Sequence, residues 1–199
     1  MADSIITGRG SIVRIDEILN HNNTDEKKFE KKDIIIRLNY SNDRCGIIRK
    51  GTAFLLSISD NGEKSIIDYY QSGDLFGAPF VSTSGTNLYY ILASTECDAV
   101  LFNYADFRDS PLLRELTLKL IRRLHIHIDI LSQRTIRRKL MLCLEYMAKI
   151  NNSDSFSLPV SLSDLADYLA ADRSAMMREL KKMNNENIII SKGQNITIL

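Results

Sequence analysis

The sequence of 199 residues predicts an α+β protein in which a β domain comes first, one long helix follows, and a small domain of short helices and strands ends the chain. Three observations support this order. Short apolar runs separated by turn residues fill the first half of the chain. Leucine and isoleucine then recur every three or four residues along one unbroken segment. From residue 159 onward, two short helical patterns precede two apolar runs that flank a turn.

The first half of the chain is expected to form a β-sandwich or a barrel, preceded by a short helix over residues 12–19. Asn61 and Gly62 lie between two apolar runs, and both residue types tolerate the positive φ angles of a tight hairpin. The glycine-bounded segment 73–77 is interpreted as a tight loop. Short strands at this spacing are typical of sandwiches and barrels. The expected strands are 34–38, 45–48, 52–59, 65–70, 88–93 and 99–103.

The middle of the chain is expected to form one long helix over residues 110–130. A stripe of this length exceeds what one small domain usually needs to cover it, so we interpret it as a dimerisation seam. Packing only on the β domain of the same chain is the alternative. A second helix is expected over residues 136–150, followed by a polar loop over 151–157. The apolar residues of the long stripe are Leu112, Leu113, Leu116, Leu120, Ile121, Leu124, Ile128 and Leu131.

The end of the chain has the layout of a winged helix-turn-helix. Ser161 precedes Asp164 by three residues, which is the spacing of a capping box at the start of a helix. Asp172 is a second candidate N-cap, for a second short helix. The apolar runs 188–190 and 196–198 flank a turn and predict the hairpin that forms the wing.

The second short helix has one face that is expected to point outward, formed by Arg173, Ser174, Met177, Arg178 and Lys181. A helix that enters the major groove with its N-terminus can place arginine against guanine O6 and N7. Arg173 and Arg178 are five residues apart, or about 500° of rotation, so they point to opposite flanks of this face. We therefore expect Arg173, Ser174 and Arg178 to read bases.

Three further residues are candidate phosphate contacts: Ser161, Lys181 and Lys192. A solvated face of an ordinary helical hairpin is the alternative to a DNA-reading face. Met177 is apolar and could equally belong to the core, and Lys181 could simply face water.

Charge is distributed unevenly along the chain. Residues 1–110 carry 12 basic and 16 acidic residues, whereas residues 111–199 carry 14 and 9. An acidic first part and a basic second part fit a sensor joined to a DNA reader. No run approaches the about 18 apolar residues of a membrane span, and the N-terminus has no signal-peptide core. We expect a cytoplasmic protein without a membrane partner.

Neither cysteine nor histidine forms a recognisable metal or catalytic pattern. We expect reduced thiols, two in strands and one in a helix, and no metal site. His125 and His127 cannot share one helix face, so a surface or interface histidine is preferred over a haem ligand. Residues 29–104 contain no histidine, so a cupin-like metal enzyme is not expected. The three cysteines are Cys45, Cys97 and Cys143.

Several motifs, taken in order along the chain, carry a resemblance. They are residues 50–51 (Lys-Gly), 60–63 (Asp-Asn-Gly-Glu), 72–77 (Ser-Gly-Asp-Leu-Phe-Gly), 164–166 (Asp-Leu-Ala), and 173–174 (Arg-Ser) through 178–180 (Arg-Glu-Leu). With these motifs the chain resembles the Crp/Fnr family of bacterial transcription regulators over residues 29–199. The resemblance implies a double-stranded β-helix (jelly-roll) barrel of the cyclic-nucleotide-binding type over 1–109, a dimerisation helix and hinge over 110–134, and a winged helix-turn-helix over 135–199. It also implies a homodimer, a palindromic double-stranded DNA site, and contact with RNA polymerase.

The chain departs from the nucleotide-binding members of this family in the effector site. Those members have Glu after Phe-Gly and a later Arg-Ser pair that holds the cyclic phosphate, where this chain has Ala78 and then Asn87-Leu88. Residues 65–107 contain no Lys or Arg, so a phosphate would lack its strongest charge-assisted hydrogen bonds. We therefore expect no cyclic AMP binding. The residues of the candidate effector pocket are Gly73, Phe76, Gly77, Ala78, Asn87 and Leu88.

The effector itself is left open. The iron–sulfur branch of the family has an N-terminal cysteine cluster, which this chain lacks. A sensor of haem or another small ligand, and a constitutive DNA binder whose barrel is only an interaction scaffold, are the alternatives. In the second short helix Ser174 stands where nucleotide-responsive members have Glu, and serine discriminates less strongly between base edges.

Overall fold

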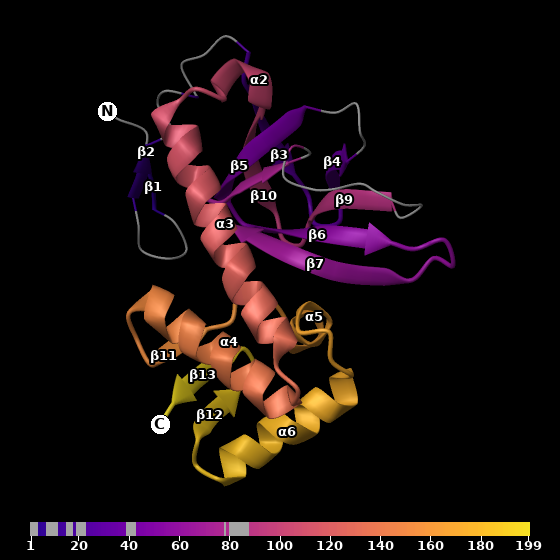
Figure 1. Ribbon diagram of the computed structural model, residues 1–199, viewed down its shortest axis with the longest axis vertical. Coiled ribbons are helices and arrows are strands. Elements are labelled where there is room, and N and C mark those ends of the chain that lie inside the picture. The colour runs from indigo at the N-terminus through magenta and orange to yellow at the C-terminus, as the bar shows by residue number, and fades with distance from the viewer. Residues whose placement is uncertain are drawn as a thin grey trace. The chain divides into compact units, whose positions relative to one another are not determined.

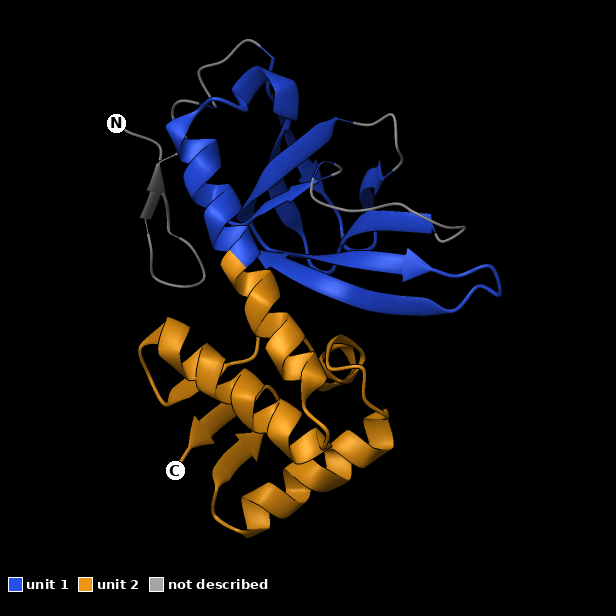
Figure 2. Ribbon diagram, in the orientation of Figure 1, with its two compact units in different colours: residues 1–121 blue, residues 122–199 orange. Residues whose placement is uncertain are grey.

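The computed structural model describes residues 4–6, 12–14, 18, 23–38, 43–77, 79 and 88–199. The chain divides into two compact units, residues 1–121 and 122–199, which are shown in different colours in Figure 2. The boundary falls inside the long helix α3 (Pro111–Ser132), so the first half of this helix belongs to the first unit and the second half to the second.

The first unit is built from two four-stranded antiparallel sheets (Figure 1). One sheet has the order β3 (Asp25–Phe29), β10 (Cys97–Asn103), β5 (Arg44–Lys50) and β8 (Leu75–Gly77). The other has the order β4 (Ile34–Leu38), β9 (Leu88–Ala93), β6 (Thr52–Ile58) and β7 (Lys64–Gln71). Hydrogen-bonded neighbours are mostly far apart in the chain, as in a jelly roll. The predicted jelly-roll barrel is therefore confirmed.

Each predicted strand is present, and the predicted turn at Asn61-Gly62 joins β6 to β7, with Gly62 at a φ of 82°. Two strands of the sheets were not predicted. Residues 75–77, interpreted as part of a loop, pair with β5 as strand β8. The charged segment Asp25–Phe29 pairs with β10 as strand β3.

The chain start also differs from the expectation. Ile12–Arg14 forms strand β2, which pairs with β1 (Ser4–Ile6), so the prediction of a helix is wrong for these residues. Ile18 is helical and buried, and the rest of the expected helix lies outside the described residues.

Strand β5 requires cover on both faces because Cys45 to Ile48 are all buried. One face packs with the first half of α3 and with α2 (Tyr104–Phe107) in a core cluster that includes Cys45, Ile47, Phe107, Leu113 and Leu116. On the other face, a Cβ at Gly46 would lie 2.7 Å from the ring of Phe76, so only glycine fits there.

This packing corrects part of the expectation for the long helix. Leu113 and Leu116 lie in the core of their own unit, and Leu120 is buried as well. The alternative, packing on the β domain of the same chain, is therefore correct for Leu113 and Leu116. The large apolar side chains that remain exposed on α3 are Leu118, Ile121, Ile128 and Leu131.

The second unit contains the rest of α3, then α4 (Ile136–Asn151), β11 (Ser155–Ser157), α5 (Leu162–Tyr168), α6 (Arg173–Asn185), β12 (Ile189–Lys192) and β13 (Asn195–Ile198). The three strands form one antiparallel sheet in the order β11-β13-β12. Phe156 pairs with Ile196, so part of the segment predicted as a polar loop is a strand. The predicted winged helix-turn-helix elements are otherwise present.

Side-chain caps begin the helices of the second unit. Thr135 Oγ1 accepts a hydrogen bond from the Arg138 N–H at 3.2 Å and begins α4. Ser161 Oγ accepts from the Asp164 N–H at 3.2 Å, and Asp172 Oδ1 accepts from the Ala175 N–H at 2.7 Å. The N-caps predicted at Ser161 and Asp172 are confirmed. In the described parts of the chain, no helix is both long and apolar enough to cross a membrane.

Candidate nucleic-acid interface

The turn between α5 and α6 is closed by backbone and side-chain hydrogen bonds. Ala170 has a φ of 46°, and its N–H donates to the carbonyl of Asp167 while the Ala171 N–H donates to Ala166. This pair of bonds is a Schellman motif, which satisfies the last carbonyls of α5. Lys139 Nζ on α4 donates to the carbonyl oxygens of Leu169 at 2.9 Å and Ala170 at 3.4 Å. The turn is thus attached to α4.

The two sides of α6 differ sharply in burial. We call the buried side the inner face; it consists of Met176, Leu180 and Met183. The exposed side is the outer face, as predicted, and its members are Arg173, Ser174, Met177, Arg178 and Lys181. The side chain of Met177 is 39% exposed, so this methionine belongs to the outer face and not to the core.

The outer face carries cations that the protein itself does not neutralise. Among the described residues, Arg173 and Arg178 have no hydrogen-bond or ion-pair partner for their guanidinium groups. Exposed guanidinium groups in this state can donate in a bidentate manner to a base edge or a phosphate. The outer face therefore presents positive charge and hydrogen-bond donors that are not occupied by other described groups of the protein.

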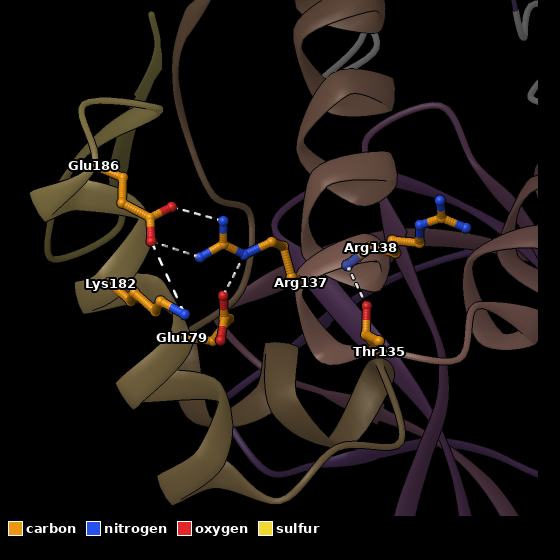
Figure 3. Close-up of polar contacts among 6 residues, drawn as sticks. All are labelled: Thr135, Arg137, Arg138, Glu179, Lys182 and Glu186. Carbon is orange, nitrogen blue, oxygen red and sulfur yellow. Dashed lines mark hydrogen bonds and ion pairs between the residues drawn. The ribbon is translucent and has the colours of Figure 1, made fainter.

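The inner side of α6 is fixed to α4 through Arg137 (Figure 3). Its Nε donates to Glu179 Oε1 at 2.5 Å, and Nη1 and Nη2 donate to the Glu186 carboxylate at 2.6 and 3.2 Å. The hydrogen bonds from Arg137 lower the pKa of Glu186, and Lys182 lies 4.0 Å from the same carboxylate. Glu179 lies within α6 and Glu186 directly after it, so one arginine holds both the helix and its C-terminal cap residue.

A second polar contact joins α3 to α5. His127 is buried, its Nε2 lies 2.9 Å from the carbonyl oxygen of Tyr168, and its ring stacks on the Tyr168 ring with centroids 3.8 Å apart. The second half of α3 and the first helix of the helix-turn-helix are therefore joined by a buried contact. A displacement of this part of α3 would be transmitted to α5.

The wing is the hairpin between β12 and β13, with Gly193 at its turn at a φ of 61°. Gln194 Nε2 donates to the carbonyl oxygens of Val160 at 2.8 Å and Leu158 at 3.3 Å, which anchors the turn to the segment before α5. Lys192 is exposed at this anchored turn.

Ser161 is a weaker candidate for a phosphate contact than the two lysines. Its Oγ accepts from the Asp164 N–H and donates to Asp164 Oδ2 at 2.6 Å. The hydroxyl oxygen is therefore already used in capping α5, and the hydroxyl proton is already donated to the Asp164 carboxylate.

The candidate effector residues that are described have structural roles. The Gly73 N–H donates to the Ile48 carbonyl at 2.7 Å, and the ring of Phe76 is fully buried with its centroid 5.8 Å from that of Tyr70. Gly77 has a φ of 146°, and a Cβ there would lie 2.4 Å from Cys45 Cα. Leu88 begins a strand of the other sheet and is 56% exposed. Ala78 and Asn87 lie outside the described residues.

The three cysteines are buried free thiols, two in strands and one in a helix, as predicted. Burial raises the pKa of Cys45 and Cys97, and it raises the pKa of Cys143 to about 12. The described residues contain no group of three or more His, Cys, Asp or Glu side chains that could hold a metal ion. His125 is exposed.

Sequence reasoning missed Arg137, Lys139 and His127, whose partners are 30 to 49 residues away. One local signal was available. The first turn of α4 contains no acidic residue but three consecutive basic ones, at 137–139. Cations at a helix N-terminus oppose the macrodipole, so they are expected to have partners elsewhere.

Comparison with known proteins agrees with this architecture. The family model for the cyclic nucleotide-binding domain matches residues 26–110, and the model for the Crp-like helix-turn-helix domain matches residues 133–199. The chain belongs to the Crp/Fnr family of transcription regulators. It is a DNA-binding regulator and not an enzyme.

The relatives span nearly the whole chain. The cAMP-activated global transcriptional regulator Vfr of Pseudomonas aeruginosa is 25% identical, over 97% of each protein. The cAMP-activated global transcriptional regulator CRP of Escherichia coli is 21% identical, over 86% of this chain and 88% of that one. The structure of FixK2 from Bradyrhizobium japonicum has the same fold, with a TM-score of 0.68 at 16% identity over 88% of this chain and 92% of that one.

Proposed function

We propose that this regulator binds a palindromic DNA operator as a homodimer, with α6 of each protomer in the major groove. The observation that carries the proposal is the pair of exposed arginines without protein partners on the outer face of α6. Arg173 and Arg178 would donate to guanine O6 and N7 in each half-site. Ser174 would contact a neighbouring base edge with weaker discrimination. The Arg137 contact, which holds α6, supports a fixed reading geometry.

Backbone contacts would come from Lys181 and Lys192, with Ser161 a weaker candidate because its hydroxyl is used in capping. These contacts would set affinity and salt dependence rather than sequence preference.

The dimer would form along α3. Leu118, Ile121, Ile128 and Leu131 are exposed there, and the first three have the three- and seven-residue spacing of a coiled-coil seam. In this arrangement residues 1–109 are the effector domain, 110–134 the dimerisation helix and hinge, and 135–199 the DNA-binding domain. Dimer states that differ in the spacing of the two α6 helices would bind the operator differently. RNA polymerase in the cytoplasm would be the further partner.

The effector domain is proposed not to respond to cAMP, although Vfr and CRP are described as cAMP-activated. Residues 65–107 contain no Lys or Arg that could neutralise a cyclic phosphate. Gly73, Phe76, Gly77, Ala78, Asn87 and Leu88 would instead border a site for an effector without an anionic group. If no such effector exists, the barrel is a scaffold and DNA binding is constitutive.

The test is selection of DNA sequences by the purified full-length protein, followed by affinity measurements on the enriched site. Arg178→Ala should weaken operator binding by about 1–3 kcal/mol and relax sequence preference at one position. Lys181→Ala should weaken binding to operator and random DNA equally and lower the salt slope by about one. Arg108→Ala, which removes a charge from an exposed position of the first unit, is the matched control and should change neither quantity.

Two results would contradict the proposal. Equal losses on operator and on random DNA for Arg178→Ala would exclude base reading by this arginine. A tenfold or greater rise in operator affinity on addition of cAMP would exclude the proposed independence from this nucleotide.

A further inference from the structure

Met177 is the one apolar side chain of the outer face, and its exposure differs from that of its neighbour. Met176 is fully buried on the inner face, whereas Met177 is 39% exposed among arginine, serine and lysine. A single exposed apolar residue is ordinary on a protein surface. Exposure alone therefore does not assign a function to Met177. Its position on α6 is the more informative observation.

That position lies between the two candidate guanine readers. With about 100° of rotation per residue, Met177 is about 40° from Arg173 and about 100° from Arg178, within the about 140° that separates the arginines. Along the axis it lies about 6 Å after Arg173 and about 1.5 Å before Arg178. Since base pairs are about 3.4 Å apart, a side chain in this place meets a base pair between those contacted by the arginines or next to them.

The chemistry of methionine restricts what it can read there. The thioether has no hydrogen-bond donor and is only a weak acceptor, so it cannot form the bidentate pairs by which polar side chains distinguish bases. The C5-methyl group of thymine is the apolar feature of the major-groove edge. A flexible, polarizable side chain such as methionine adapts readily to a small apolar group.

We infer that Met177 reads a thymine methyl group in each half-site, at a base pair between those contacted by Arg173 and Arg178 or next to them. The inference rests on the proposed major-groove position of α6. The backbone of Met177 is well placed for such a contact because its neighbours hold α6 from the inner side. Met176 and Leu180 are buried, and Glu179 accepts a hydrogen bond from Arg137 at 2.5 Å.

The decisive experiment changes the DNA and leaves the protein intact. After the operator has been identified by selection, each thymine of the half-site is replaced singly by deoxyuridine, which lacks only the methyl group. At one position the replacement should lower the affinity of the wild-type protein about fourfold per half-site, the factor that corresponds to losing one buried methyl group. Replacement in both half-sites should lower it about sixteenfold.

Two substitutions connect this effect to Met177. Met177→Ala should bind the thymine and deoxyuridine operators equally, whereas Met177→Leu, which keeps an apolar side chain of similar size, should retain most of the discrimination. Both variants should unfold at the wild-type temperature because the side chain is exposed.

Three other outcomes would each contradict a specific claim. Equal binding of the wild-type protein to the thymine operator and to every deoxyuridine operator excludes methyl reading. Methyl discrimination that persists in Met177→Ala assigns the contact to another residue. Failure to enrich any DNA sequence contradicts the proposed operator function itself, and the inference with it.

Discussion

The inner and outer faces of α6 contain similar residues in opposite circumstances. Met176 and Met177 are adjacent, yet one is fully buried and the other is 39% exposed. Arg137 donates to two carboxylates at the inner side, whereas Arg178 on the outer face has no partner among the described residues. The side with satisfied groups holds the helix, and the side with unsatisfied donors is available to a ligand. The type of a residue alone therefore does not determine whether its side chain holds α6 in place or is available to a ligand.

The largest expected effect is the difference in stability between substitutions of Met176 and of Met177. Met176→Ala should lower the free energy of unfolding by about 2–5 kcal/mol, because it removes a fully buried side chain and leaves a cavity. Met177→Ala should change it by less than about 0.5 kcal/mol, as is usual for exposed positions. Denaturant unfolding of both variants measures the difference. Equal destabilisation would mean that the two faces do not differ in packing.

A smaller effect is expected at the Arg137 contact. Arg137→Met should lower the thermal midpoint by several degrees, because Glu179 and Glu186 would lose their common partner. The pKa of Glu186 is lowered from its ordinary 4.5, so its contribution to stability is complete above that pH and is lost as the pH falls through the lowered value.

Thermal unfolding of both proteins between neutral and acidic pH measures this contribution. The difference in midpoint between wild type and Arg137→Met should be constant near neutral pH and should shrink once the pH falls below 4.5. Arg138→Met is the matched control, because it removes the neighbouring charge without touching either glutamate. A difference that stays constant down to strongly acidic pH would exclude the ionic contribution.

The smallest effect is expected at Ala170, in the turn between α5 and α6. Ala170 adopts the left-handed conformation, at a φ of 46°, which costs alanine about 1–2 kcal/mol. Glycine adopts it freely but loses more entropy on folding, so Ala170→Gly should stabilise the protein by up to about 1 kcal/mol. Ala171→Gly, next in the chain and without a positive φ, should be neutral or destabilising. Calorimetry distinguishes these outcomes.

The features that could be predicted from the sequence depend on residues close together in the chain. Ser161 and Asp164, three residues apart, predicted the start of α5, and the exposed face of α6 followed from helical periodicity. The turn at Asn61-Gly62 was also a local signal. The roles of Arg173, Ser174 and Arg178 remain predictions.

The features that were missed depend on distant partners. Phe156 is the single apolar residue of β11, and this strand exists because it pairs with β13, 40 residues further along. The run Ile12–Arg14 fits a helix or a strand equally well, and its pairing with β1 decides. In α3 the apolar spacing could not show which leucines the β domain would cover.

The burial of all three thiols makes this protein convenient for labelling. Burial raises the pKa of Cys45, Cys97 and Cys143, so the reactive thiolate form of each is suppressed at neutral pH. A cysteine introduced at an exposed position, such as Asn185→Cys at the end of α6, would therefore react far faster than any native thiol. A fluorophore could be attached there without removing a single native cysteine, and it would report arrival at DNA directly.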